Sequence, residues 1–248
     1  MTADAENDQL YVYGIVAENT TLPAGLTGVS EGAVETTTHG PLAAVVTRLS
    51  DEDELGTPDN LLAHSRVLDS IAEHITILPM AFGTIVPSED ELQEAVLELN
   101  ETEYHEALER LAESVQFTVR ARYIRDAVLA DLIEDDPQVV ELREAIAGTT
   151  EDETRQERIA LGELVVGAFG RIRPEHAQYI IDAVSPIVED IQEHEGGQVE
   201  DVVEMAVLVS RDRVSEFEAA LEVAAEQLHT RINFQLLGPQ APYDFVGD

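Results

Sequence analysis

The sequence predicts an α+β protein of two domains, the second a modified ferredoxin-like fold with inserted helices. Runs rich in β-branched and aromatic residues alternate with helical patterns along the 248 residues, a length that suits one large domain or two ordinary ones. Residues 124–184 carry only helical signals. From the strand at 115–123 onward the order is strand, helices, strand, strand, helix, strand, which is ferredoxin-like with extra helices after its first strand.

The expected organisation has three parts. Residues 1–9 (MTADAENDQ) are acidic and polar, so we expect a disordered tail that is no signal peptide. An N-terminal α+β domain is expected over 10–113. A C-terminal ferredoxin-like domain is expected over 114–248, with its extra helices at about 124–184.

The first elements read as strands followed by a helix. Residues 10–16 (LYVYGIV) are β-branched and aromatic, which predicts a strand with Tyr11 and Tyr13 on one face. A Gly-Pro turn joins a short strand at 32–38 to another at 42–48. An amphipathic helix follows at 58–74, and its first residue is a proline, which suits a helix start.

The run 77–86 (ILPMAFGTIV) is the least polar stretch of the first half and predicts its core strand. Pro79 has no amide hydrogen and disfavours a helical conformation at Leu78, so the preceding helix must end before Leu78. Phe82, Thr84 and Val86 alternate with their neighbours, which suits a strand buried on both faces.

The remaining elements follow from capping and periodicity. Ser88 and Glu91 form a capping box at the start of an acidic helix. The helix at 159–172 is apolar nearly all round; it is either a surface for an apolar partner or a buried core helix, and the sequence favours the core helix. A new helix is expected at Pro174. Strands are expected at 187–194, 202–209 and 232–237, a helix at 214–228, and a packed, non-helical end at 238–246.

Charge is the strongest compositional feature. Asp and Glu number 51 against 14 basic residues, all arginine, for a formal charge of −37. Self-repulsion of this size opposes compaction at ordinary salt, whereas molar salt shortens the Debye length to about 3 Å. Because the acids are spread along the whole chain, a salt-filled cytoplasm, as in halophilic archaea, is favoured over a local acidic partner-binding patch. Nucleic-acid binding is not expected, because no basic patch exists.

Nothing in the sequence predicts an enzyme. There is no cysteine, no phosphate-binding loop, no nucleophile elbow and no zinc helix, and the seven histidines are scattered. We therefore expect no catalytic, metal-binding or cofactor-binding residues. No run reaches the roughly 18 apolar residues of a membrane span, so a cytoplasmic protein is expected.

Four segments, in order, resemble the gas vesicle protein F/L family (GvpF/GvpL). The first two are the opening strand LYVYGIV and the helix that contains His64 and a Val-Leu pair. The third is ILPMAFGT, which resembles the family's ILPMRFGT. The fourth is MAVLVSR followed by LLGPQAPYDFV, which resembles the family's closing GPWPPYSFV. Ala81 stands where the family often has Arg, and Gln240 with Ala241 where it has Trp-Pro. Partner contacts made by those family residues are therefore in doubt here.

The resemblance implies the two α+β domains and a cytoplasmic, vesicle-associated accessory protein of gas vesicle formation that performs no catalysis. It implies binding to the hydrophobic major shell protein and to other accessory vesicle proteins. The alternative is a small-molecule-binding regulatory protein, because ferredoxin-like domains often sense ligands. For partner contact we select Tyr11, Tyr13, Met80, Phe82 and Ile85, with the helix at 159–172 as second choice.

The charge generates the first testable prediction. In molar KCl, far-UV circular dichroism should show a native α+β spectrum, and near 0.1 M KCl the structure should be lost because the carboxylates repel one another unscreened. Retention of the full spectrum and the same melting temperature at low salt would contradict the halophilic interpretation.

Overall fold

The computed structural model describes residues 9–50, 53 and 55–247, with the side chains of 132–135 left out. Most of the expected acidic tail thus lies outside the described residues. The chain divides into two compact units: one runs up to Phe117 and resumes at Gly238, and the other is Thr118–Leu237. The closing residues, which the sequence grouped with the second half, belong to the first unit because Ala241 is fully buried in its core.

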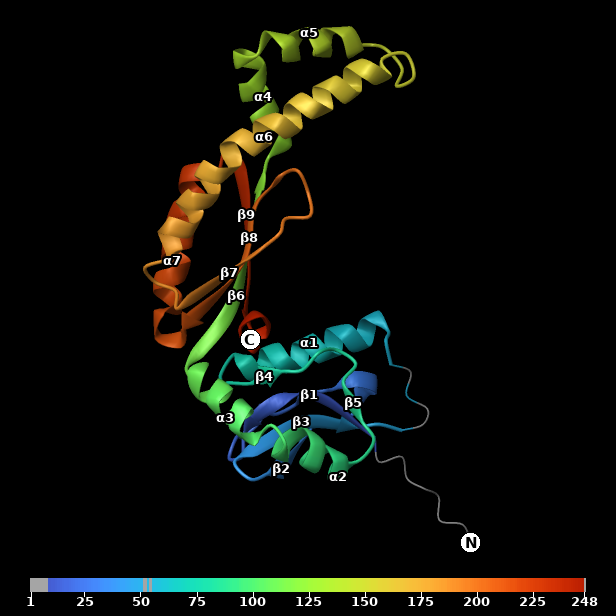
Figure 1. Ribbon diagram of the computed structural model, residues 1–248, viewed down its shortest axis with the longest axis vertical. Coiled ribbons are helices and arrows are strands. Elements are labelled where there is room, and N and C mark those ends of the chain that lie inside the picture. The colour runs from blue at the N-terminus through green and yellow to red at the C-terminus, as the bar shows by residue number, and fades with distance from the viewer. Residues whose placement is uncertain (1–8, 51–52, 54, 248) are drawn as a thin grey trace. The chain divides into compact units, whose positions relative to one another are not determined.

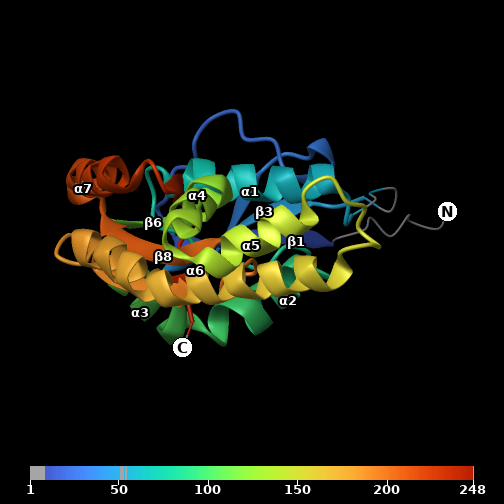
Figure 2. The ribbon, with the colours of Figure 1, turned by 90° about the horizontal axis from the view of Figure 1, so that it is seen from above.

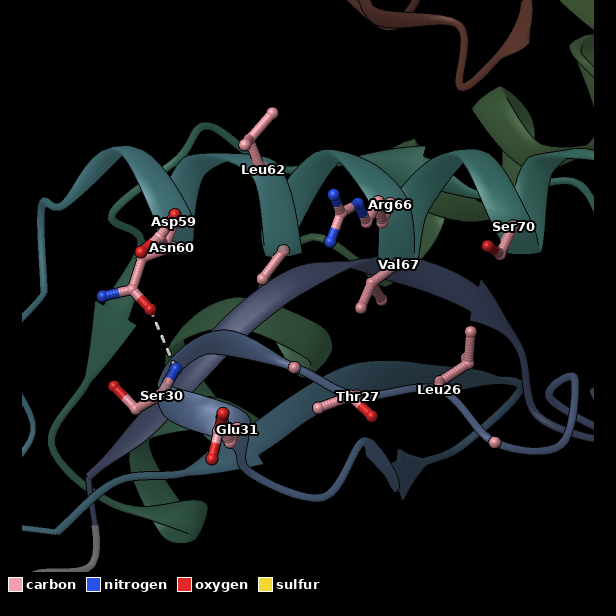
Figure 3. Close-up of a pocket in the computed structure, with 13 residues that line it drawn as sticks. Leu26, Thr27, Ser30, Glu31, Asp59, Asn60, Leu62, Arg66, Val67 and Ser70 are labelled. Carbon is pink, nitrogen blue, oxygen red and sulfur yellow. Dashed lines mark hydrogen bonds between the residues drawn. The ribbon is translucent and has the colours of Figure 1, made fainter.

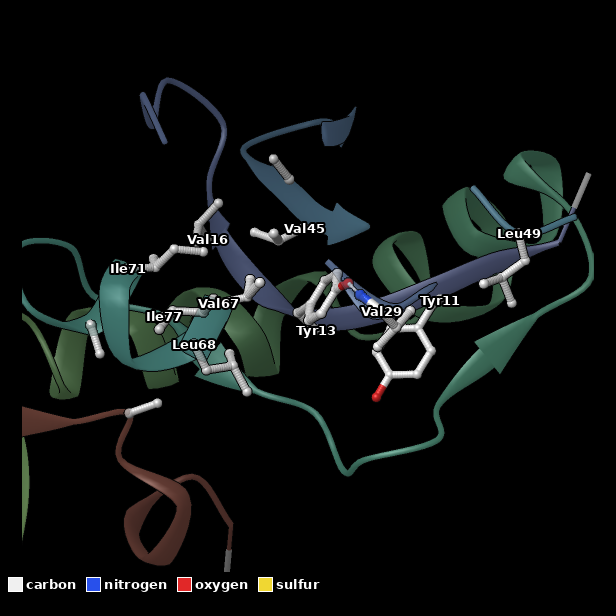
Figure 4. Close-up of a cluster of buried hydrophobic side chains, with 13 residues drawn as sticks. Tyr11, Tyr13, Val16, Val29, Val45, Leu49, Val67, Leu68, Ile71 and Ile77 are labelled. Carbon is white, nitrogen blue, oxygen red and sulfur yellow. Dashed lines mark hydrogen bonds between the residues drawn. The ribbon is translucent and has the colours of Figure 1, made fainter. Parts of the chain in front are cut away.

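The first unit is built on a sheet with the order β2-β3-β1-β4, in which β5 also pairs with β1. The central strand β1 (Leu10–Ala17) is antiparallel to β3 (Leu42–Arg48), and β3 is antiparallel to β2 (Glu35–His39). Helix α1 (Pro58–Ala72) packs over this sheet, and Figure 4 shows the cluster of buried side chains that α1 and β1 share. On the opposite face lie α2 (Glu89–Glu91), the π-helical segment Leu92–Glu98 and α3 (Glu101–Arg110) (Figure 1).

The predicted core strand at 77–86 is not continuous. It forms two short strands, β4 (Leu78–Pro79) and β5 (Ile85–Val86), both antiparallel to β1. A turn separates them, in which Gly83 has φ +87°, a left-handed conformation that glycine adopts without strain. The expectation failed because alternating apolarity cannot show that one residue leaves the extended region.

Close backbone packing also constrains β1 at Gly14. A Cβ at this position would lie 2.5 Å from the Leu78 carbonyl oxygen and 2.9 Å from Ile77 Cγ1. Since Gly14 pairs with Pro79, a side chain there would push β4 away from the centre of the sheet.

The second unit has the predicted ferredoxin-like arrangement. Its sheet has the order β7-β8-β6-β9, and α6 and α7 cover one face (Figure 1). Two further helices follow β6, and the second of them, α5, lies beside the first half of α6 (Figures 1 and 2). The bounds are β6 Ser114–Tyr123, α4 Arg125–Asp135, α5 Pro137–Ile146, α6 Arg155–Val184, β7 Asp190–His194, β8 Asp201–Ser210, α7 Val214–Leu228 and β9 Ile232–Gln240; the short 3-10 turns are η1 Val29–Glu31, η3 Arg211–Arg213 and η4 Tyr243–Phe245.

Helix α6 corrects two expectations. It continues through Pro174 instead of ending before it. A proline ring crowds the carbonyl four residues earlier, which here belongs to Gly170; both residues are exposed, so water can satisfy that carbonyl. Nor is the helix buried all round: Val165 and Phe169 are buried, whereas Ile159 and Val166 are 54% and 50% exposed.

The close approach at Gly14 gives the second prediction. Gly14→Ala should lower the free energy of unfolding in molar KCl by about 2–3 kcal/mol, because an overpacked Cβ forces the backbone of β4 to move. The matched control is Gly167→Ala, where a Cβ meets nothing within 4 Å and the variant should gain up to about 1 kcal/mol of helix propensity. Equal stability of Gly14→Ala and the parent in denaturant titration would refute this account of β1.

Candidate functional site

The five residues selected for partner contact separate by exposure. Tyr11 and Tyr13 are both 0% exposed and belong to the core of the first unit (Figure 4). Met80 and Phe82 are half-buried, and Ile85 is 41% exposed. Only the last three therefore have surface to offer a partner, and their contact with one remains a prediction.

The two tyrosines instead support the turn that carries Met80 and Phe82. The Tyr11 and Tyr13 rings lie 5.0 Å apart, which confirms that they share one face of β1. The Gly83 amide donates to the Tyr11 hydroxyl at 3.1 Å, and the Met80 amide donates to the Tyr13 carbonyl at 2.8 Å. Within the turn, Thr84 Oγ1 donates to the Ala81 carbonyl at 2.7 Å.

A buried histidine from α1 completes this cluster. His64 is 2% exposed, and its Nδ1 lies 2.9 Å from the Tyr11 hydroxyl. Its Nε2 lies 3.3 Å from the hydroxyl of Tyr243, in η4 of the closing segment. The imidazole stacks on Tyr13 with ring centroids 5.7 Å apart and meets the Phe82 ring edge-on at 5.6 Å. We call these five residues the His64 cluster: Tyr11, Tyr13, His64, Phe82 and Tyr243.

Burial keeps the titratable groups of the cluster uncharged. It lowers the pKa of His64 from the usual 6.5, against a backbone hydrogen bond with Met80 that raises it. Burial also raises the pKa of Tyr11 to about 12, and the pKa of Tyr13 is raised for the same reason. At neutral pH the cluster therefore carries no charge, an arrangement that suits structural support.

From the sequence, His64 was named only as part of the family resemblance, and its contact with Tyr243 was not predicted. The closing segment was expected to pack because it is aromatic and cannot be helical. The aromatic residues of this proline-containing segment indicated that Tyr243 is packed, but they did not indicate which residue it contacts. Asp69, one turn along α1 from the cluster, has its pKa raised by partial burial and forms a hydrogen bond with the backbone of Ala241.

A pocket of about 630 Å³ lies between α1 and the loop that contains η1. Figure 3 shows Asn60 reaching from α1 to this loop, where its Oδ1 accepts a hydrogen bond from the Ser30 amide at 2.8 Å. The contact holds Ser30 and Glu31 in left-handed conformations with φ of 50° and 59°. The lining mixes the acids Glu31 and Asp59 with Arg66, so no single ligand charge is favoured.

Among residues 9–50, 53 and 55–247, no three His, Asp or Glu side chains gather in a way that could hold a metal ion. Within the same ranges, every helix is too short or too polar to cross a membrane.

The lowered pKa of His64 gives the third prediction. Protonation of the histidine favours the unfolded chain, in which its pKa is near 6.5. The stability that neutral His64 contributes is therefore complete above pH 6.5 and is lost as the pH falls below that value. Between pH 7.5 and 5.5 the parent should lose about 1 kcal/mol of unfolding free energy relative to His64→Gln in molar KCl.

His74→Gln supplies the control: His74 is exposed and its replacement leaves the His64 cluster intact, so this variant should lose stability relative to His64→Gln as the parent does. Comparing variants removes the contribution of the many carboxylates, which titrate alike in all three proteins. If the parent and His64→Gln showed parallel pH profiles, a neutral His64 would contribute nothing to stability.

Comparison with known proteins identifies the family. Residues 9–247 match the family model described as gas vesicle synthesis protein GvpL/GvpF. Gas vesicle protein F of Streptomyces sp. is 32% identical over 95% of this chain and 98% of its own length, and that of Haloferax mediterranei is 24% identical over 97% and 94%.

A solved structure shows the same fold. The crystal structure of the gas vesicle protein GvpF from Anabaena sp. superposes with a TM-score of 0.79 at 20% identity, over 97% of this chain and 99% of that one. The match of fold, together with the family model over nearly the whole chain, establishes that this protein belongs to the gas vesicle protein GvpL/GvpF family.

Proposed function

We propose that this protein is an accessory protein of gas vesicle formation that binds the hydrophobic shell subunit through the turn between β4 and β5. Membership of a gas vesicle synthesis family carries the proposal. The contact surface consists of Met80, Phe82 and Ile85, which we call the turn surface. We place its action in a high-salt cytoplasm and at the vesicle, on the strength of the acidic, lysine-free composition.

The turn surface is suited to apolar contact because its shape is fixed before binding. Hydrogen bonds from Gly83 and Thr84, and the ring of His64 beneath Phe82, hold the turn in one conformation. A surface ordered in advance loses little conformational entropy when it binds. The turn surface itself is small, because Met80 and Phe82 are half-buried and Ile85 is 41% exposed.

The charge of the chain suits the same task. An apolar shell subunit aggregates before assembly unless its surface is covered. A partner that carries −37 formal charges keeps the complex dispersed, because complexes of like charge repel one another. This binding requires no chemical step. Burial keeps the side chains of Tyr11 and His64 uncharged at neutral pH.

The fourth prediction tests the turn surface in the full-length protein. Ile85→Asp and Met80→Asp should weaken capture by a tagged shell subunit in molar KCl at least about tenfold, because a charged group would have to be buried against an apolar partner. Leu99→Asp is the control: Leu99 is 80% exposed in the same unit and directly follows the π-helical segment Leu92–Glu98, so capture should be unchanged.

Circular dichroism should show that each variant is folded. Capture of all variants at the parental level would contradict the turn surface. Loss of capture in Val166→Asp alone would move the contact to α6, where Val166 is half exposed.

A further inference from the structure

The second unit contains a pocket that the proposed function does not use. It lies between α4, α5 and the first half of α6, with a volume of about 520 Å³, which is within the range of ligand sites. Its apolar lining comes from all three helices: Leu129, Ala130, Ile146, Leu161, Gly162 and Val165.

Three arginines share the pocket with these apolar residues. Arg125, Arg143 and Arg158 line it, against one acid, Asp126. The whole chain has only 14 arginines and 51 acids. A lining with a net charge of +2 is therefore a reversal of the charge found along the rest of the sequence, and it attracts anionic groups.

The arginines of the pocket form few ion pairs and hydrogen bonds within the second unit. Arg125 Nη1 lies 3.0 Å from Glu200 Oε1. Arg158 donates to two neutral oxygens, Thr154 Oγ1 and the Thr149 carbonyl, both at 3.3 Å. Across the described side chains, neither Arg143 nor Arg158 has a carboxylate within 4 Å.

Structural roles explain part of this arrangement. Arg143 is in the last turn of α5, where a cation offsets the helix dipole, and Arg158 ties the loop before α6. Neither role requires both guanidinium groups to border an apolar pocket. A planar guanidinium beside apolar surface is the combination that recognises a carboxylate on an apolar body.

The pocket continues onto an open face of α6. Gly162 lines it, and one turn further along the helix Val166 is 50% exposed; Ile159, on the same side, is 54% exposed. A Cβ built on Gly162 meets nothing within 4 Å, so a partner can approach the helix backbone closely at this residue. From Ile159 to Val166 the exposed face is about 10 Å long, the length of two turns of a docked helix.

We propose that this pocket and the adjoining face of α6, together the α4–α6 groove, bind an amphipathic helix of a partner protein whose apolar face is flanked by Asp or Glu. Apolar side chains of that helix enter between Leu129, Ile146 and Leu161, and its carboxylates meet Arg143 and Arg158. The inference rests on the proposed function only in taking the partner from among accessory vesicle proteins. The groove is separate in sequence and in structural unit from the turn surface.

The test uses the full-length protein and two labelled synthetic helical peptides with the same leucine stripe, one flanked by Glu and the other by Gln. Fluorescence anisotropy in molar KCl should show the Glu peptide binding at least about tenfold more tightly. Arg143→Gln and Arg158→Gln should each reduce that preference to less than about threefold. Arg171→Gln, which removes an exposed arginine of α6 outside the lining, should leave it unchanged.

Gly162→Leu separates the shape of the groove from its charge. The added side chain projects into the pocket and should weaken both peptides, while the fold is retained because the position is open. Equal binding of the two peptides to the parent, or binding unaffected by the arginine and Gly162 variants, would overturn the proposal. In the capture assay the turn surface is tested by Ile85→Asp and Met80→Asp, neither of which lies in the groove, so the failure of the turn surface and the failure of the groove are distinguishable.

Discussion

The first unit depends on a buried, neutral imidazole. Both nitrogens of His64 need partners because an unsatisfied polar atom in the core costs about 1–3 kcal/mol. The Tyr11 hydroxyl on β1 and the Tyr243 hydroxyl on η4 lie within hydrogen-bond distance of the two nitrogens, and the Met80 backbone forms a further hydrogen bond with the imidazole. The imidazole therefore links three elements: helix α1, the central strand β1 and the closing segment with η4. Each of them constrains the position of the other two.

This constraint explains why the turn between β4 and β5 is held so firmly. The Tyr11 hydroxyl serves both His64 and the amide of Gly83. Phe82 packs against the imidazole from the outside of the cluster. The contacts that stabilise the core thus also fix the positions of Met80 and Phe82, two residues of the proposed contact surface.

Much of this fold could be predicted from sequence periodicity. The strand at 10–16, the capped helix starts at Pro58 and Ser88, and the ferredoxin-like order of the second half are confirmed. These succeed because local patterns reflect which face of an element is buried.

Features that depend on distant contacts could not be predicted. Alternating apolarity at 77–86 did not reveal the turn at Gly83. Pro174 predicted the start of a new helix, but α6 continues through it, because Pro174 and Gly170 are exposed and water can satisfy the Gly170 carbonyl. The contact of His64 with Tyr243 and the position of Arg143 and Arg158 in one pocket arise only when separate segments pack.

The closing segment has a consequence for synthesis on the ribosome. Ala241 and Phe245 are buried in or against the first unit, yet they are translated after all of Thr118–Leu237. At typical elongation rates, the nascent first unit waits on the order of ten seconds with its core unfilled. During that interval His64 has no Tyr243 to bond, and the turn it supports is less firmly held. The core of the first unit is therefore complete only when the chain is nearly finished.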